Sequence, residues 1–454
     1  MATTNVEAQD WLKSEDSKEY FELLKFQSVG ADPDRLGDSA RCATWLKKWL
    51  EKTGAEAELV TKDFAPPVLF AEFKAEEGAP SVLFYGHYDV QPPDPLDQWL
   101  TPPFEPTLNG DRVYARGAQD DKGQLFAFLC GVREFVADNP GRINLKVILE
   151  GQEESGSTAL SKLLPELKSK LAADVLLVCD SGAAAGLRPA IVAGLRGVSH
   201  FTVKLTAANR DLHSGEYGGI APNAAQGMAE LVSSLHNPDG SIAVFGFRDG
   251  IEPPSHEELR TAEATAPDES ALRDDIGCEP VGGQLGRTIV QRNGFEPTIE
   301  INGIHSGYGG PGSKTVIPCE AIAKISMRLV PGQNPERAFA AVREHLENRV
   351  PRGMKMEISE LTGGAAGFRL PLASPLFRLA EDVLGEMDDR GAVFYWNGAS
   401  IPIVSALREI SGAAPLLVGW GQSEDRIHSP NESFSVAQFA RAKEWALKIL
   451  GSLA

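Results

Sequence analysis

Apolar and polar residues follow two different patterns along the chain. In the first part, short apolar runs at 81–86 (SVLFYG), 143–149 and 174–179 predict buried strands. Stretches with apolar residues on one helical face predict helices at 38–51, after a capping aspartate, and at 121–136. Strands that alternate with helices at this spacing predict a largely parallel α/β sheet.

The pattern changes near Arg196. Residues 199–207 (SHFTVKLTA) alternate polar and apolar side chains, which is typical of an antiparallel strand with one exposed face. The segments that follow predict a helix after Pro222 and then strand, strand, helix and strand, at 298–301, 321–330, 335–348 and 354–360. This order suits a separate α+β sandwich of the ferredoxin-like kind.

A chain of 454 residues is too long for one ordinary domain. The last part, from about Ser374, returns to helix, strand and helix, and the glycines of 363–367 suit an exit from the insertion. We therefore expect an α/β catalytic domain with a mixed, largely parallel sheet, split by an inserted α+β domain. The expected boundaries are 1–197 and 364–454 for the catalytic domain and 198–363 for the insertion.

Charge and cysteine usage narrow the function. The net charge is −19, which argues against nucleic acid and against an anionic membrane surface as partners. The N-terminal residues show no secretory signal, and no apolar stretch is long enough to span a bilayer. The five cysteines are scattered singly without a CxxC pair, so a reducing cytoplasm is expected and any metal would need histidine and carboxylate ligands.

Candidate ligands follow the predicted strands. His87 and Asp89 come directly after the first apolar run, and residues two apart in extended backbone point the same way. Asp89 could then accept the second ring N–H of His87, as ligand histidines require. Taken alone, a His-x-Asp pair is more often structural.

Acidic residues occupy three further strand or helix ends. Asp120 and Asp121 open a helix, where the simpler interpretation is helix capping and the sharper one is that Asp120 bridges two metal ions. Glu153 and Glu154 follow the second strand; in extended backbone one could bind metal while the other faces the substrate as general base. The simpler interpretation of this pair is a solvated acidic turn.

Two more candidates complete a metal-binding set. Asp180 ends the third strand, at the edge where α/β sheets bind their ligands, and His428 lies in a late loop. Each residue alone has an ordinary explanation, a turn aspartate or an exposed histidine. Together the series supplies two histidines and three carboxylates, which suit zinc, although manganese or cobalt fit the same set.

The chain resembles family twenty of the metallopeptidases, which includes aminoacylase, carboxypeptidase G and the carnosine dipeptidases. It is most similar to the cytosolic nonspecific dipeptidase type. The matching stretches span most of the chain: 86–92 (GHYDVQP), Trp99 with 103–104, 116–123 (RGAQDDKG), 153–156 (EESG), 211–215 (DLHSG), 314–318 (KTVIP), 328–331 (RLVP) and 428–429 (HS).

The resemblance implies roles for these positions. His87, Asp120 and Asp180 would hold one zinc ion, and Asp120, Glu154 and His428 the other. Glu153 would be the general base, with Asp89 as a further catalytic residue. The Asp120–Asp121 peptide is often cis in this family.

The resemblance also implies a dimer with composite sites. The inserted domain would be a lid that dimerises, and His213 of one subunit would reach the active site of the other. Arg328 would bind a substrate carboxylate, a role that suits the bidentate guanidinium group. Substrate-binding roles also fall on Lys314, Thr315 and Ser400, and Asp180 is the ligand found in dipeptidase-like members.

The chain departs from the dipeptidase pattern at two positions. The glutamate expected to meet the free amino group of the substrate is Asn397, and a small polar residue in the loop before the last histidine is Arg426. The predicted function is hydrolysis of dipeptides or similar small peptides. Asn397 favours a rival, hydrolysis of N-acyl amino acids, and a more remote alternative is a binding protein that has lost catalysis.

Overall fold

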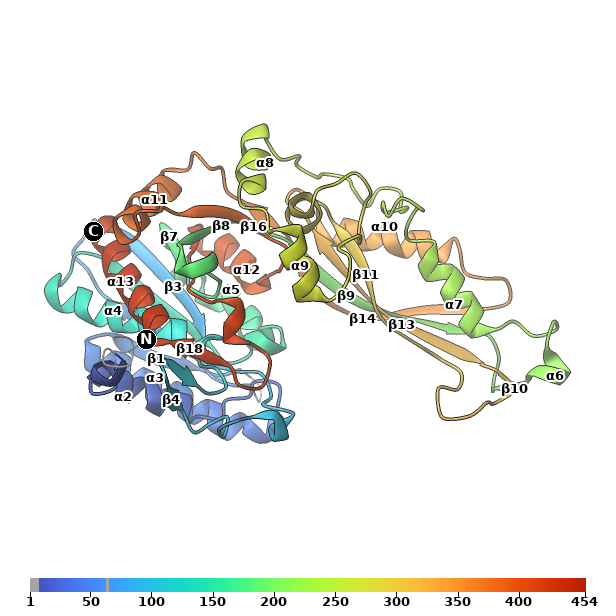
Figure 1. Cartoon of the computed structure of the whole chain (residues 1–454), viewed down its shortest axis with the longest axis horizontal. Coiled ribbons are helices and arrows are strands. Elements are labelled where there is room, and N and C mark those ends of the chain that lie inside the picture. The colour runs from blue at the N-terminus through green and yellow to red at the C-terminus, as the bar shows by residue number, and fades with distance from the viewer. Residues whose placement is uncertain (1–7, 63–64) are drawn as a thin grey trace. The chain divides into compact units, whose positions relative to one another are not determined.

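The computed structural model describes residues 8–62 and 65–454 (Figure 1). These residues form two compact units. Among the described residues, the first unit comprises 8–62, 65–192, 371–394 and 406–454, and the second comprises 193–370 and 395–405.

A six-stranded mixed sheet is the centre of the first unit. The strand order is β1-β2-β6-β3-β7-β17, in which β6, β3, β7 and β17 are parallel neighbours and β1 and β2 are antiparallel. The bounds are β1 Glu56–Val60, β2 Val68–Phe73, β3 Ser81–His87, β6 Asn144–Glu150, β7 Val175–Val178 and β17 Ala414–Leu417. The prediction of a mixed, largely parallel sheet is confirmed.

The central strands are buried because nearly every side chain in them is apolar. All residues of β7 are buried, and so are six of the seven residues of β3. Strands with both faces covered read as continuous apolar runs, as the sequence predicted. The carboxyl ends of β3, β6 and β7 lie at one edge of the sheet, where Asp180 and the pair Glu153–Glu154 follow.

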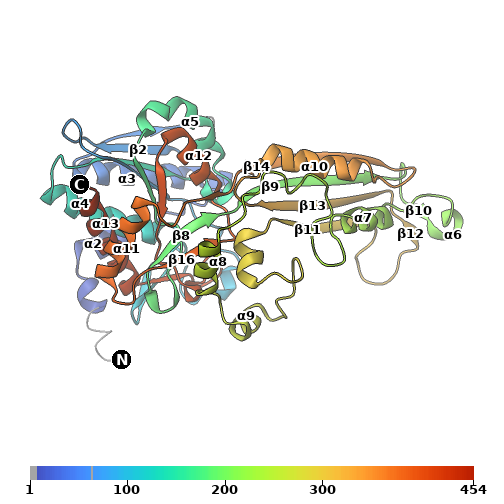
Figure 2. The ribbon, with the colours of Figure 1, turned by 90° about the horizontal axis from the view of Figure 1, so that it is seen from above.

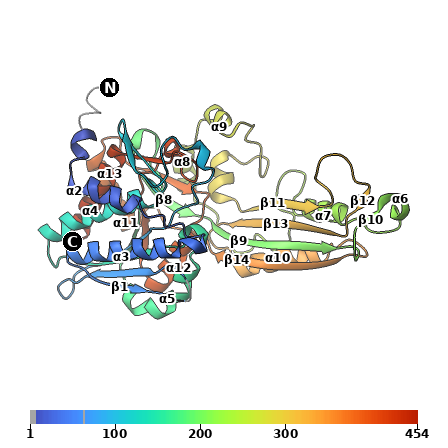
Figure 3. The ribbon, with the colours of Figure 1, turned by 90° about the horizontal axis from the view of Figure 1, so that it is seen from below.

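Helices pack against this sheet and against one another. α3 runs alongside β1 (Figure 3), and α4 lies beside the C-terminal helix α13 (Figure 1). The bounds are α2 Glu15–Leu24, α3 Leu36–Thr53, α4 Lys122–Asp138, α5 Thr158–Leu171, α11 Pro375–Met387, α12 Pro402–Ser411 and α13 Val436–Leu453. The expected aspartate cap of α3 is wrong: the helix begins two residues before Asp38, and the residue at its cap position, Arg35, makes no side-chain capping hydrogen bond.

The second unit contains a four-stranded antiparallel sheet in the order β11-β13-β9-β14. Its elements follow the chain as β9 Gly197–Thr206, α7 Ala224–Ser233, β11 Thr298–Ser306, β13 Glu320–Leu329, α10 Pro335–Glu347 and β14 Lys355–Ala365. This is the ferredoxin-like sequence of elements that the pattern predicted.

One face of this sheet carries the core of the second unit. α7 and α10 run along the strands (Figure 2) and share a hydrophobic cluster with alternate residues of β9 and β13. Phe201, Val203 and Leu205 point into the cluster, whereas Lys204 lies outside it and forms an ion pair with Glu320. Period-two alternation therefore has the expected physical cause, a sheet with one apolar face.

The remaining elements are short. The first unit also has β4 Thr107–Asn109, β5 Arg112–Tyr114 and β18 Ser433–Ser435, which pair in the order β18-β5-β4. The second has β10 Leu212–His213, β12 Val316–Ile317, β15 Phe368–Arg369, α6 Ser214–Tyr217, α8 His256–Glu263 and α9 Glu269–Ile276. The chain passes between the units four times: within β8 (Ala190–Leu195), between residues 370 and 371, within β16 (Val393–Asn397) and within α12.

The second unit is larger than the expected insertion, 198–363. It begins at residue 193, ends at 370 and includes 395–405 as well. The extra segment belongs to it because Arg196 donates a hydrogen bond to the carbonyl of Gly398, 2.8 Å away, and Arg328 donates one to Ser400. Hydrophobic patterning gives no sign of these long-range polar contacts.

Across residues 8–62 and 65–454, no helix has both the length and the apolar character that crossing a membrane requires. All five cysteines are free thiols, and Cys42, Cys130 and Cys179 are buried.

Candidate metal centre

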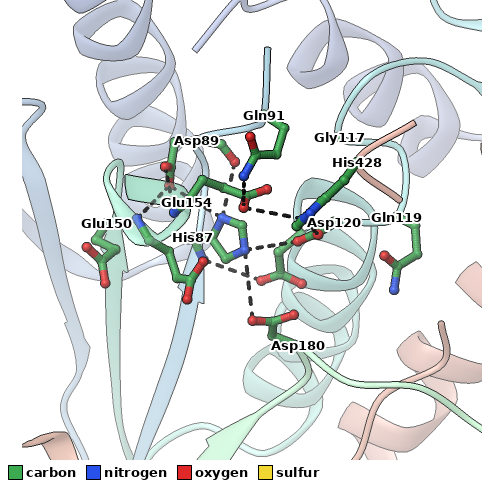
Figure 4. Close-up of polar contacts among 12 residues, drawn as sticks. His87, Asp89, Gln91, Gly117, Gln119, Asp120, Glu150, Glu154, Asp180 and His428 are labelled. Atoms are coloured by element: carbon green, nitrogen blue, oxygen red, sulfur yellow. Dashed lines mark hydrogen bonds and ion pairs between the residues drawn. The ribbon is translucent and has the colours of Figure 1, made fainter. Parts of the chain in front are cut away.

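His87 is the last residue of β3, and its imidazole lies among carboxylates (Figure 4). Its Nε2 is 3.2 Å from Oδ1 of Asp120 and 3.9 Å from Oδ2 of Asp180. The ring is fully buried, and Nε2 has no hydrogen-bond partner. A buried nitrogen without a partner, aimed at two carboxylates, suits a metal ligand better than a core histidine.

A second group lies next to the first and shares Asp120 with it. Nε2 of His428 is 2.9 Å from Oδ2 of Asp120 and 3.4 Å from Oε2 of Glu154. In each group, His87–Asp120–Asp180 and Asp120–Glu154–His428, the ligand atoms lie within 4.8 Å of one another. The structure thus brings together all five residues that the sequence predicted as ligands, with Asp120 between the two groups.

Helix capping does not account for the aspartates before α4. Asp121 occupies the cap position but makes no side-chain capping bond; its Oδ2 accepts a hydrogen bond from the backbone N–H of His87 at 3.3 Å. The peptide between Asp120 and Asp121 is cis, as the resemblance implied.

Asp89 was expected to accept a hydrogen bond from the ring of His87, but its carboxylate mainly binds backbone N–H groups. Nδ1 of His87 is 3.1 Å from the backbone oxygen of Asp89 and 3.4 Å from its Oδ1. The two carboxylate oxygens of Asp89 instead accept the backbone N–H groups of Glu153 and Glu154, each at 3.1 Å. The side chain therefore links β3 to the turn that carries both glutamates.

The prediction of extended backbone at Glu153 and Glu154 is wrong. Residues Glu153–Ser155 form a 3-10 turn, because Asp89 binds both N–H groups and Gly156 continues the chain with a φ of 96°. Glu154 still faces His428, and its Oε2 accepts a hydrogen bond from Gln91 at 2.8 Å. Glu153 belongs to neither ligand group.

Charges in the site shift several pKa values. Burial, reinforced by Asp120, raises the pKa of Asp180 to about 7, and burial also raises that of Glu153 well above its usual range. Hydrogen bonds to Asp120 and then Glu154 raise the pKa of His428 to about 10. Like charges held this close favour the binding of a cation between them.

A fully buried carboxyl group lies at the end of β6. Glu150 accepts hydrogen bonds from the hydroxyls of Tyr85, at 2.9 Å, and Ser157, at 2.7 Å. Burial, reinforced by Asp89, raises its pKa to about 7. Sequence reasoning assigned no role to Glu150 or to Gln91, because neither residue type indicates a contact across strands.

The remaining candidates lie in the second unit, in two separate places. Oγ of Ser400 accepts a hydrogen bond from Nη1 of Arg328 at 2.9 Å. His213 is exposed on β10, which pairs with β12 just after Lys314 and Thr315. Arg328 lies eight residues from Glu320 at the other end of β13, about 26 Å at 3.3 Å per residue.

His213 makes the local contact that a turn cap would make. Its Nδ1 accepts a hydrogen bond from the N–H of Gly215 at 3.0 Å. In the neutral ring this contact places the proton on Nε2, which can then act as a donor.

Comparison with known proteins places the chain in a family. Residues 83–451 match the model described as peptidase family M20/M25/M40. The chain belongs to this family. It is a hydrolase, and the resemblance inferred from its motifs is confirmed.

The alignments with three named relatives cover most of this chain. Human Beta-Ala-His dipeptidase is 33% identical over 378 residues, which cover 82% of this chain and 74% of the relative. Cys-Gly metallodipeptidase dug1 of Schizosaccharomyces pombe is 30% identical over 404 residues, 83% of this chain and 80% of the relative. The M20 family metallo-carboxypeptidase Sso-CP2 from Sulfolobus solfataricus is 28% identical with a TM-score of 0.86, covering 97% and 99% of the two chains.

Proposed function

We propose that this M20 hydrolase cleaves the amide bond of dipeptides or similarly small peptides and uses two zinc ions. The observation that carries the proposal is the pair of ligand groups that share Asp120. Relatives named Beta-Ala-His dipeptidase and Cys-Gly metallodipeptidase support the substrate class.

The donor set fits two divalent ions. Three carboxylates and two imidazoles form a ligand set that suits zinc, and manganese or cobalt would accept the same set. His87 Nε2 and Glu154 Oε1 are buried without hydrogen-bond partners, which bound ions would provide.

Glu153 has the properties of a general base in such a site. Bound metals would supply Lewis acidity and lower the pKa of water. Burial raises the pKa of Glu153, so the group can take a proton from the attacking water and pass it to the leaving amine. Asp89 holds the backbone of Glu153 in place.

Arg328 is proposed to bind the substrate carboxylate. Among the described side chains, no carboxylate lies within ion-pair distance of its guanidinium group, and Ser400 accepts one of its hydrogen bonds. Arg196, which raises the local positive charge, holds the loop of Ser400 through the carbonyl of Gly398. A free anion-binding group next to a hydroxyl suits one end of a small peptide.

The active form is proposed to be a homodimer in a reducing, cytoplasmic compartment. His213, Lys314 and Thr315 lie at the opposite end of β13 from Arg328 in the same chain. Two groups so far apart can contact one dipeptide only if they come from different subunits. Free thiols at all five cysteines support the compartment.

A second candidate function is hydrolysis of N-acyl amino acids or of C-terminal residues. Asn397 stands where the dipeptidase pattern has glutamate, and its neutral amide offers no negative charge to an ammonium group. Its Oδ1 already accepts a hydrogen bond from the N–H of Ala399 at 2.9 Å. The name of Sso-CP2 supports the same alternative.

One substrate panel separates the two functions. Protein with a measured zinc content of two equivalents is given free dipeptides and the matching N-acetylated amino acids and N-acetylated dipeptides. The proposal expects the highest kcat/KM for free dipeptides. A preference of tenfold or more for the acetylated compounds would establish the second candidate function.

A further inference from the structure

Glu432 has a buried carboxylate that accepts four hydrogen bonds. The residue is 1% exposed. Its Oε2 accepts hydrogen bonds from Nη1 of Arg116 and from the backbone N–H of Gly117, both at 2.8 Å. Its Oε1 accepts hydrogen bonds from the backbone N–H groups of Gln119, at 2.9 Å, and Asp120, at 3.0 Å. Four donors fix this carboxylate in position, while burial raises the pKa of the group from its ordinary value.

The donors all come from the segment that leads into α4. Three of them are backbone N–H groups, so the carboxylate fixes the path of the main chain up to and including Asp120. Asp120 is the residue shared by both ligand groups. Its side-chain direction depends on this backbone, because the side chain is short and its carboxylate stays close to the main chain.

The same glutamate is tied to the loop of His428. Glu432 follows His428 by four residues, and its backbone oxygen accepts the N–H of Ala115 at 3.1 Å. The next residue pairs with Tyr114 where β18 meets β5. One side chain thus couples the main chain at Asp120 to the loop that supplies His428.

Arg116 balances the buried charge. It is also 1% exposed, its Nη2 donates to the carbonyl of Pro92 at 3.2 Å, and its guanidinium lies 5.3 Å from the ring centroid of Trp99. A buried pair of this kind gives little net stability, which points to a role in specifying geometry.

We propose that Glu432 is a positioning residue that sets the separation of Asp120 and His428 and so the affinity of the site for metal. This inference rests on the proposed metal centre. Outer residues that hold ligands in place typically change metal affinity about 10- to 100-fold when they are replaced.

Asp425 offers a matched control in the same loop. It is fully buried, pairs with Arg112, and accepts the N–H of Gln422 at 2.7 Å and Nε2 of Gln438 at 2.6 Å. None of these partners is a proposed ligand. Asp425→Asn therefore disturbs a buried carboxylate–arginine pair without touching Asp120.

The experiment compares Glu432→Gln with Asp425→Asn and wild type after removal of metal by a chelator. Zinc is titrated against a chromophoric competitor, and thermal unfolding and kcat are measured on the same samples. Glu432→Gln should weaken zinc binding about 10- to 100-fold, with kcat recovering in excess zinc. Asp425→Asn should bind zinc within about threefold of wild type even if both variants unfold at similarly lowered temperatures.

Equal zinc affinity in wild type and Glu432→Gln, or equal losses in the two variants, would overturn the positioning role. Absence of zinc binding by wild type would instead overturn the metal centre itself and the inference with it. If Glu432→Gln does not fold, Glu432→Asp replaces it: the shorter side chain keeps the charge but cannot reach all four donors. A smaller loss of zinc affinity is then expected, and an unchanged zinc affinity would refute the inference.

Discussion

Glu153 and Glu154 are neighbours in sequence with different surroundings. Glu154 faces His428 and Asp120, whereas Glu153 lies outside both ligand groups and has a raised pKa. Adjacent side chains on a tight turn diverge, so one turn can supply both a ligand and a base.

Exchanging each glutamate for glutamine separates the two roles. Glu153→Gln should lower kcat by about 100- to 10,000-fold and leave zinc content near two equivalents, because an amide cannot accept the proton. Glu154→Gln should lose zinc. Elemental analysis and steady-state kinetics on the same preparations measure both, and a reversed pattern would exchange the assignments.

Arg328 should determine the response to the substrate carboxylate. Arg328→Ala is expected to raise KM for free dipeptides about 10- to 100-fold and KM for the corresponding dipeptide amides much less, since charged hydrogen bonds contribute roughly 1.5–3 kcal/mol. Initial rates over a range of both substrates provide the measurement. Equal effects on both would indicate a structural role.

Removal of metal should make stability depend on pH in a defined direction. In the metal-free protein the pKa of Asp180 is raised to about 7 from 3.8, so the native state keeps a proton that the unfolded chain has lost. The contribution of Asp180 to stability is then fully present below pH 4 and is lost as the pH rises toward 7. The raised pKa of His428, about 10, extends the decline above pH 6.5.

Thermal unfolding of chelator-treated protein at pH 5.5 and 7.5 checks this prediction. The unfolding temperature should be lower at pH 7.5, and Asp180→Asn should reduce the difference. Added zinc should stabilise the protein more at the higher pH. A metal-free protein that is more stable at pH 7.5 would contradict the assigned shift.

At the scale of elements, the start of α4 holds the shared ligand against its neighbours. A Cβ on Gly123 would lie 1.9 Å from the backbone oxygen of Ala118 and 2.9 Å from Cδ1 of Phe434. The close contact joins the first turn of α4 to the segment before Asp120, and only glycine permits it.

Gly123→Ala should therefore destabilise the fold by about 1–3 kcal/mol and weaken zinc binding, since crowding a packed site displaces backbone. Gly385 is the control, because it is exposed in α11 and a Cβ added there would meet no atom within 4 Å. Gly385→Ala should stabilise by roughly 0.5–1 kcal/mol without affecting zinc. Chemical denaturation and zinc titration of both variants test this contrast.

Hydrophobic patterning predicted the buried strands β3, β6 and β7 and the sandwich of the second unit, because burial imposes a clear period on side chains. It did not predict the antiparallel neighbours β1 and β2, whose pairing depends on distant chain segments. The five candidate ligands could be named because histidines and carboxylates follow the predicted strands in an order that resembles the motifs of a known family. Glu432 and Gln91 could not, because their roles come from contacts made only in the folded chain.

At the scale of the whole molecule, composite sites in a dimer can be tested by subunit mixing. His213→Ala should be folded and bind zinc normally, but lose about 100- to 1,000-fold in kcat if its Nε2 donates to the oxyanion. Mixing it with inactive Glu153→Gln should restore activity, because some mixed dimers hold one intact site. Full activity of His213→Ala would mean that His213 has only a structural role, its hydrogen bond with Gly215.

Subunit exchange must be shown for the mixture to be informative. Differently tagged wild-type subunits, mixed under the same conditions and recovered together by affinity capture, provide this control. If exchange is complete and no activity returns, His213 does not act across subunits even where it is essential.

The order of the ligands along the chain also has a consequence for synthesis. His87, Asp120, Glu154 and Asp180 precede the second unit, whereas His428 lies more than half of the chain length after Asp180. At about 5–20 residues per second, a ribosome adds the missing histidine roughly ten seconds to a minute after the other four ligands. A growing chain can therefore form the first candidate ligand group early, but it can form the second group only after the second unit has been synthesised.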